Sequence, residues 1–314
     1  MPASASRIPS LPDDTSALLT LRDWLRFAVS LFHREKLFFG QGAVSAYDEA
    51  VFLLQHTLHL PHRGLETFLD ARLTAEEIHR IKTVLARRAL NREPAAYITG
   101  EAWLGDFSFR VDPRVIVPRS YFLEIIPEQL NQWLPDPEDV AAIADVCTGS
   151  GCLAILLALA YPQATVDAVD ISSAALEVAA LNVADYQLEE RVTLHQSDVL
   201  ASVPAPAGGY DIIVCNPPYE PEAVLPTLPE EFRHEPSQAL VSGADGLDVI
   251  RQLLPQAAQR LSRNGILLIE VGGLHEAVAD AWPDLPVQWL ATQDESDCIA
   301  LLHATDLRRQ FSPR

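Results

Sequence analysis

The stretch of sequence that decides the fold reads Ala142-Ile-Ala-Asp-Val-Cys-Thr-Gly-Ser-Gly-Cys-Leu-Ala154. A short apolar run leads directly into a glycine-containing loop, Cys147-Thr-Gly-Ser-Gly151, and helical sequence follows from Cys152. Glycine lets the backbone turn sharply and approach a ligand closely. A strand, a glycine loop and a helix in this order are typical of the nucleoside-binding start of a doubly wound sheet.

Downstream of this loop, strands alternate with helices. Helices are expected to begin at Cys152 and Ser173, and another is expected over 247–261. The expected strands are 142–147, 165–171, 192–196, 211–215 and 266–271, and two closing strands are expected at 286–291 and 298–303. Such alternation implies a mostly parallel sheet with helices on both faces. We therefore expect an α/β domain over residues 131–314.

Upstream, residues 16–95 are expected to form a small helical domain. Apolar residues recur at spacings of three and four between Leu18 and Val29, which predicts one buried helix face. Thr74 followed by Glu77 is typical of a helix start, with the threonine as the cap. Alternating, aromatic-rich sequence over 101–117 then predicts a β-hairpin inside a linker at 96–130.

The N-terminal sequence and the overall composition indicate a cytoplasmic protein. Residues 1–15 are small, polar and proline-rich, lack the pattern of a signal peptide, and predict a flexible tail. No apolar run approaches the roughly 18 residues that a membrane-spanning helix needs. The four cysteines form no Cys-x-x-Cys pair and are expected to be buried thiols. His56, His59 and His62 are interrupted by Pro61, so we expect no metal site.

The net charge of −20 is unevenly distributed. Residues 1–110 hold 13 lysines and arginines against 13 aspartates and glutamates, whereas residues 111–314 hold 10 against 30. An acidic domain repels a nucleic-acid backbone and attracts a basic partner, which favours a basic protein substrate. A basic stretch at residues 80–92 has two interpretations, a solvated helix face and a contact with RNA or the ribosome.

Two further acidic residues follow predicted strands. Asp170 ends the strand after the glycine loop, where a carboxylate can hold both ribose hydroxyls of a nucleoside cofactor. Asp198 follows the next strand, where it can accept a hydrogen bond from the exocyclic amine of adenine. These residues do not identify the cofactor, because Gly149-x-Gly151-x-x-Ala154 also fits a dinucleotide fingerprint.

Asn216-Pro217-Pro218-Tyr219 narrows the chemistry, since it follows a predicted buried strand at the edge of the sheet where ligands bind. The two prolines fix φ and remove two N–H donors, which leaves carbonyl groups as acceptors. The carbonyls of Asn216 and Pro217 can then accept both hydrogens of one planar NH2 group, and Tyr219 offers a ring face for stacking. Holding both hydrogens orients the nitrogen lone pair towards an electrophile.

These motifs together resemble the class I (Rossmann-like) methyltransferases that modify amide or exocyclic amine nitrogens. Within that group the chain resembles the protein-(glutamine-N5) methyltransferase family of HemK and PrmB, in the branch that acts on ribosomal protein L3. The likeness covers nearly the whole chain from about residue 20. Besides the glycine loop and Asn216–Tyr219, it rests on Leu37–Gly42, Asp48–Ala50, Leu58–Pro61, Pro94–Tyr97, Thr99–Glu101, Val117–Ser120, Arg233–Pro236 and Gly243–Leu247.

The resemblance implies a function and a set of site residues. S-adenosylmethionine would be bound by Cys147, Thr148, Gly149, Ser150, Gly151, Asp170, Asp198 and Asn216. Asn216, Pro217, Pro218 and Tyr219 would form the catalytic motif, and Asn216, Pro217, Tyr219, Arg119 and His234 would contact the substrate. The helical domain would dock a glutamine-bearing protein, free ribosomal protein L3 or L3 in a ribosome precursor. One departure, Asp294-Glu-Ser-Asp297 in place of a glycine-rich turn, leaves the closing hairpin open.

Other functions compete with this one. A release factor presents the same glutamine chemistry. Adenine or guanine amines of RNA or DNA are methylated with the same Asn-Pro-Pro-Tyr motif, although the acidic domain argues against DNA. A dehydrogenase would use the glycine loop but has no need of the proline pair, and an inactive binding module would not need every polar group of the motif. Arg233–Pro236 either shapes the substrate pocket or closes its loop.

Overall fold

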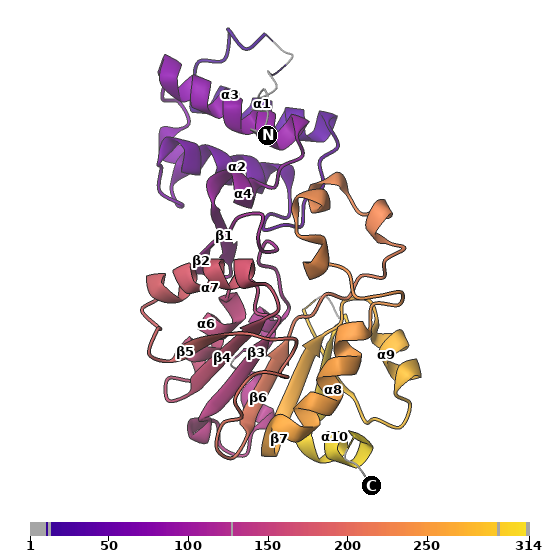
Figure 1. The fold of residues 1–314 in the computed structure, drawn as a ribbon. Coiled ribbons are helices and arrows are strands. Elements are labelled where there is room, and N and C mark those ends of the chain that lie inside the picture. Colours follow the sequence, from indigo (N-terminus) through magenta and orange to yellow (C-terminus); the bar gives the residue numbers. More distant parts are fainter. Residues whose placement is uncertain (1–10, 12–13, 127, 294–295, 312–314) are drawn as a thin grey trace, which may run out of the picture. The chain divides into compact units, whose positions relative to one another are not determined.

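The computed structural model describes residue 11 and residues 14–126, 128–293 and 296–311 (Figure 1). The chain divides into two compact units. The helical unit extends to Ala102 and includes Pro229–His234, whereas the sheet unit holds Trp103–Leu228 and the chain from Glu235 onward. The predicted tail at 1–15 lies mostly outside the described residues.

The helical unit packs amphipathic helices around an apolar core. Its helices are α1 (Leu21–Arg34), α2 (Ala46–Leu58), α3 (Ala75–Leu90), α4 (Ala95–Thr99), and the short 3-10 helices Leu65–Phe68 and Glu230–His234. Capping boxes begin α1, at Thr20 and Asp23, and α3, at Thr74 and Glu77. The predicted helix start at Thr74 is confirmed, and its cap satisfies backbone donors that the helix itself leaves unpaired.

A buried ion-pair cluster joins residues 229–234 to these helices. The Arg88 side chain is only 1% exposed, and its Nε donates to Glu49 Oε1 at 2.5 Å. Its Nη1 donates to Glu231 Oε1 at 3.2 Å and its Nη2 to the Phe38 carbonyl at 2.7 Å. Removing one partner of such a buried pair leaves an uncompensated buried charge and lowers the free energy of unfolding by about 3–5 kcal/mol.

Much of the predicted basic stretch is engaged inside the helical unit. Arg87 donates through Nε to Glu93 at 2.7 Å, Arg88 is buried as described, and Arg92 donates to Glu231 at 3.4 Å. Phosphate binding requires several cations that are available on one surface. RNA contact through this stretch therefore has little support in the structure and stays a prediction.

A two-stranded hairpin, β1 (Glu101–Leu104) with β2 (Phe107–Arg110), confirms the hairpin predicted from the aromatic alternation. The predicted domain limit between residues 95 and 96 falls inside α4 (Ala95–Thr99), whose C-cap Gly100 has φ +74°, and it stays a prediction. The sequence also did not place 229–234 with the helices. A buried ion pair helps to attach this segment, and such a pair produces no periodic pattern of apolar residues in the sequence.

The sheet unit holds a seven-stranded sheet in the order β5-β4-β3-β6-β7-β9-β8. Five strands run parallel, and β9 pairs antiparallel with both β7 and β8. The strands are β3 (Ala142–Val146), β4 (Thr165–Asp170), β5 (Val192–Gln196), β6 (Tyr210–Cys215), β7 (Leu261–Glu270), β8 (Gln288–Leu290) and β9 (Ile299–His303). The predicted α/β class I fold is confirmed, including the closing strands. Asp294 and Glu295 of the departing turn lie outside the described residues.

Helices cover both faces of this sheet (Figure 1). One apolar core includes residues of α5 (Phe122–Ile125), α6 (Cys152–Ala160) and α7 (Ser173–Asp185). The other includes residues of α8 (Asp248–Arg260), α9 (His275–Ala281) and α10 (Ala304–Phe311). Short 3-10 helices complete the unit at Leu130–Trp133, Pro137–Asp139, Leu225–Thr227 and Ser237–Ala239. Among the described residues, no helix has the length and apolar character of a membrane span.

The strand order sets the place of the site. From β3 the chain continues to β4 and β5 on one side, and after β5 it crosses back to β6 on the other side of β3. A crevice forms at such a switch point, outside the carboxyl ends of the strands. The glycine loop after β3, Asp170 at the end of β4 and Asn216 after β6 all lie at this edge.

Candidate functional site

A cavity of about 350 Å³ lies at the carboxyl edge of the sheet unit. It brings together residues from four predicted motifs that are far apart in the sequence. Those lining it include Cys147, Gly149, Asp170, Asp198, Asn216 and Pro218, with Val249 and Gln252 of α8. Of the other predicted site residues, Thr148, Ser150, Gly151, Pro217 and Tyr219 adjoin these in sequence but do not line the cavity.

The glycine loop takes a backbone conformation that few other sequences would accept. Gly149 has φ +54° and Gly151 has φ +81°, both in the left-handed region. Gly151 also packs close to α7, because an added Cβ would lie 3.2 Å from the Cβ of Ala179. Cys147 adopts φ +63° without being glycine. The loop is held in place by hydrogen bonds from Thr148 N to the Val169 carbonyl at 2.9 Å and from Gly149 N to Asp170 Oδ2 at 2.9 Å.

Asp170 is fixed by backbone donors on both of its carboxylate oxygens. Oδ2 accepts from Gly149 N, and Oδ1 accepts from Ser172 N at 2.9 Å. Burial raises the pKa of Asp170, and these two hydrogen bonds lower it in part. Asp198 also lines the cavity and lies against Gln252. With its NH2 group turned towards this carboxylate, the Gln252 amide donates to both oxygens at 3.0 and 3.1 Å. Both carboxylates thus face the cavity in defined orientations.

Asp145 on β3 supports the loop from behind. Its Oδ2 accepts from Thr148 Oγ1 at 2.6 Å and from Ala154 N at 2.9 Å. Its Oδ1 is buried and has no hydrogen-bond partner among the described residues. Burial raises the pKa of Asp145 to about 7. A cationic group of a ligand bound at this loop would stabilise the ionised carboxylate.

The charges around the cavity distinguish the two cofactor classes that the sequence left open. A dinucleotide needs donors or cations for its pyrophosphate, but Arg114 at the cavity wall already pairs with Asp112 at 2.6 Å and Glu177 at 2.7 Å. S-adenosylmethionine has no phosphate, and its sulfonium and ammonium groups suit a cavity with an acidic lining. Its ribose hydroxyls and adenine amine are donors that suit the carboxylates of Asp170 and Asp198. The residues of this site therefore fit S-adenosylmethionine.

Asn216–Tyr219 leaves β6 in a tightly constrained loop. Glu220 N donates to the Leu240 carbonyl at 2.8 Å and Ser242 N to the Glu220 carbonyl at 3.0 Å, which pins the loop just after the motif. An added Cβ at Gly246 would lie 2.2 Å from the Tyr219 carbonyl oxygen, and one at Gly272 would lie 2.7 Å from the Tyr219 ring. Only glycine fits at these two positions while Tyr219 keeps its place.

Arg119 and His234, predicted to contact the substrate, have other partners here. Arg119 binds Glu235 with two hydrogen bonds, Nη1 to Oε1 at 2.6 Å and Nη2 to Oε2 at 2.8 Å. His234 belongs to the helical unit, where its Nε2 lies 2.9 Å from the Asn91 carbonyl oxygen. Neither residue lines the cavity. Their roles in substrate binding stay predictions.

Sequence reasoning missed one acidic residue of the site, Glu270 at the end of β7. It is 3% exposed and accepts hydrogen bonds from Ser120 Oγ at 2.6 Å and Tyr121 N at 3.1 Å. The Asn216 side chain lies beside it and lowers its pKa. Burial raises the pKa of Glu270 to about 7 against these stabilising contacts. The available signal was a lone acid that ends an otherwise apolar strand, Ile266-Leu-Leu-Ile-Glu270.

Comparison with known proteins identifies the family. Residues 127–246 match the Methyltransferase small domain, and residues 34–100 match the PrmC N-terminal domain. The ribosomal protein uL3 glutamine methyltransferase of Bordetella pertussis is 51% identical over 285 residues, which cover 91% of this chain and 95% of that protein. The chain belongs to the family of ribosomal protein uL3 glutamine methyltransferases. It is therefore a methyltransferase, as the resemblance predicted.

Other family members agree over a similar span. The ribosomal protein uL3 glutamine methyltransferase of Burkholderia pseudomallei is 47% identical over 92% of this chain and 95% of that protein. Among solved structures, the hMettl16 catalytic domain in complex with MAT2A 3'UTR hairpin 1 matches with a TM-score of 0.51 at 14% identity, covering 81% of this chain and 89% of that one. At that identity the match shows the fold alone.

Proposed function

We propose that this member of the uL3 glutamine methyltransferase family transfers a methyl group from S-adenosylmethionine to the side-chain amide nitrogen of a glutamine in ribosomal protein uL3. The observation that carries the proposal is the place of Asn216-Pro-Pro-Tyr219. The motif leaves β6 at the carboxyl edge of the sheet, and Asn216 lines the same cavity as Asp170 and Asp198.

The cofactor side of the cavity is formed by the loop after β3 and the ends of the two neighbouring strands. Asp170, oriented by Gly149 N and Ser172 N, would accept hydrogen bonds from ribose hydroxyls. Asp198 would accept one from the adenine amine, alongside Gln252. When bound, S-adenosylmethionine supplies an electrophilic methyl group on a positively charged sulfur.

The substrate side must turn a poor nucleophile towards that methyl group, because the lone pair of an amide nitrogen is delocalised into its carbonyl. Pro217 and Pro218 have no N–H groups, so this part of the loop offers acceptors only. Carbonyl oxygens of Asn216 and Pro217 that accept both amide hydrogens would hold the nitrogen in place and draw electron density to it. This is catalysis by positioning and electrostatics.

No strong general base is required in this scheme. Once the nitrogen carries the methyl group, it holds one proton too many and is strongly acidic. That proton leaves readily to water or to a nearby acceptor. The carbonyl oxygens that hold the two N–H groups also stabilise the positive charge that develops on them during the transfer.

Two observations favour a basic ribosomal protein as the substrate. The relatives named above are ribosomal protein uL3 glutamine methyltransferases. The excess of 30 acidic over 10 basic residues in 111–314 would draw a basic protein towards the sheet unit and repel a nucleic acid. The predicted cytoplasmic location is the compartment in which such a substrate is made.

The test is mass spectrometry of ribosomal proteins from cells with and without this enzyme, followed by reconstitution with purified protein, cofactor and uL3. We expect one uL3 glutamine to lose the mass of a CH2 group in cells without the enzyme and to regain it in vitro. Methylation of a release factor in place of uL3 would reassign the substrate within the same chemistry. Methyl label found in RNA, with none in protein, would refute the proposal.

A further inference from the structure

We propose that Glu270 is a positioning residue that fixes the orientation of the Asn216 side-chain amide, so that the amide oxygen of Asn216 is presented to the substrate. This inference rests on the proposed function, in which Asn216 accepts a hydrogen bond from the substrate NH2 group. It adds a residue that the sequence analysis did not single out.

The strand register places the two side chains together. Strands β6 and β7 run parallel, and Cys215 of β6 is opposite Ile269 of β7. The residues that follow are Asn216, directly after β6, and Glu270, the last residue of β7, so the two lie at the same level along the sheet. Neighbouring positions of a parallel pair direct their side chains to the same face. This register brings the Asn216 amide beside the Glu270 carboxylate, where it lowers the pKa of that carboxyl.

Hydrogen-bond chemistry then decides which end of the Asn216 amide meets Glu270. An ionised carboxylate can only accept hydrogen bonds, whereas an asparagine amide has one donor end and one acceptor end. Ser120 Oγ and Tyr121 N already donate to Oε2 of Glu270. The Asn216 NH2 group must therefore face Glu270, which turns its Oδ1 away from the carboxylate. An acceptor oxygen is what a substrate NH2 group needs.

Without this constraint, asparagine would be a poor choice at the site. An amide can rotate by half a turn and present its NH2 group, which would repel the hydrogens of the substrate amide. Glu270 removes that alternative because its carboxylate would repel the Oδ1 of Asn216 if the amide were turned the other way. The glutamate thus selects one orientation of the Asn216 amide. It does so from a buried position, where its Oε2 accepts hydrogen bonds from Ser120 Oγ and Tyr121 N.

Glu270 holds this orientation of Asn216 only when it is ionised, and the surrounding groups make its ionisation sensitive to pH. The groups that face it are Ser120, the Tyr121 backbone, Asn216, the Arg119 guanidinium and the Tyr219 hydroxyl. Burial raises the pKa of Glu270 to about 7, and the positive charge of Arg119 limits the rise. A protonated Glu270 can donate to the Asn216 oxygen and so reverse the amide.

The decisive variant is Glu270→Gln, which keeps the size and shape of the side chain. In E270Q, the side-chain oxygen of the new glutamine must still accept from Ser120 and Tyr121. The NH2 group of that glutamine therefore faces Asn216 and needs an acceptor there. The Asn216 amide then turns its own NH2 towards the substrate. We expect kcat to fall by about 10²-fold, with the dissociation constant for S-adenosylmethionine and the melting temperature changed little.

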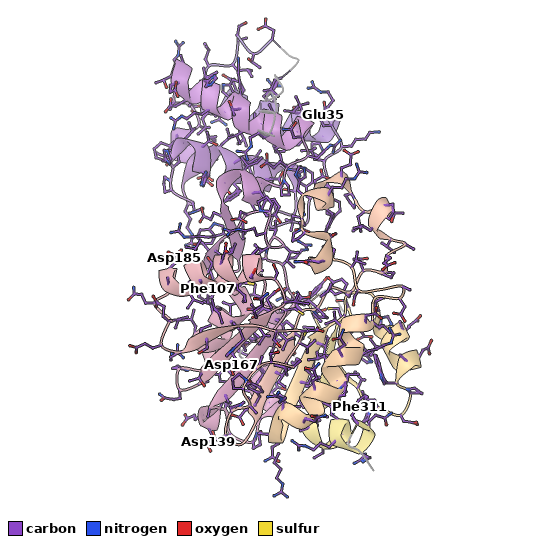
Figure 2. All side chains as sticks on the ribbon, in the orientation of Figure 1. Glu35, Phe107, Asp139, Asp167, Asp185 and Phe311 are labelled. Carbon is purple, nitrogen blue, oxygen red and sulfur yellow. The ribbon has the colours of Figure 1, made fainter. Side chains whose placement is uncertain are left out.

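The pH profile separates orientation from a merely structural role. In the wild-type enzyme, kcat should rise with pH through an ionisation near 7 and be lost as pH falls below it, since only the ionised carboxylate holds the active orientation. E270Q should lack this ionisation. Asp167→Asn is the matched control, because it neutralises a partly buried carboxylate of β4 (labelled in Figure 2) that bonds Tyr210 and His195 instead of Asn216. D167N should keep the wild-type kcat and profile.

A measurement on the protein alone makes the inference independent of its activity. With the asparagine side chains labelled with 15N, the Asn216 NH2 resonance should shift with a midpoint near pH 7 in the wild type and stay constant in E270Q. The inference is overturned if the resonance does not titrate, or if E270Q keeps wild-type kcat. Failure of the proposed function has a different signature, since no glutamine would be methylated by the wild type while the NMR titration would be unaffected.

Discussion

At the scale of single residues, the carboxamide of Asn216 bears most of the proposed chemistry. Truncating it in Asn216→Ala removes one of the two acceptors for the substrate amide, and we expect kcat to fall by about 10²–10³-fold. Affinity for S-adenosylmethionine should stay close to the wild type, because Asp170, Asp198 and the glycine loop are intact. Single-turnover methylation of uL3 together with calorimetric cofactor titration checks both expectations. Full activity in N216A would remove this residue from the mechanism.

At the scale of elements, the turn after β7 holds the ring of Tyr219. Gly272 has φ +53° and leaves no room for a Cβ, whereas an added Cβ at neighbouring Gly273 meets nothing within 4 Å. Gly272→Ala should lower the unfolding free energy by about 1–2 kcal/mol because of the left-handed backbone, and it should displace the ring. We expect up to about a 10²-fold loss of kcat/KM from that displacement. Denaturant unfolding and steady-state kinetics measure both effects.

Gly273→Ala provides the matched control for that turn. It adds the same methyl group one residue further on, at a position outside the left-handed region, and should leave both stability and kcat/KM close to wild type. Equal losses in G272A and G273A would mean that the turn tolerates no alanine at all. They would contradict the specific contact between Gly272 and Tyr219.

The elements also show which parts of the molecule could be predicted from the sequence. The parallel strands and the capped start of α3 were predictable because their signals, apolar runs and a capping box, are local. The place of Asn216 at the cavity was predictable because its motif is contiguous. Glu270 was missed because its importance depends on the register of β6 and β7, which no single segment encodes. The association of 229–234 with the helices could not be predicted for a similar reason, since the Arg88–Glu231 pair joins positions far apart in the chain.

At the scale of the whole molecule, the uneven charge predicts how the enzyme meets its substrate. The net charge of −20 resides in residues 111–314, and the field of these residues should steer a basic protein towards the catalytic unit. Salt shortens the range of that field, from a Debye length of about 10 Å at 0.1 M to about 3 Å at 1 M. We therefore expect KM for uL3 to rise severalfold over this range while kcat changes little. A short neutral peptide with the same glutamine is the control, and an equal rise in its KM would show that salt acts on the site itself and not on the encounter.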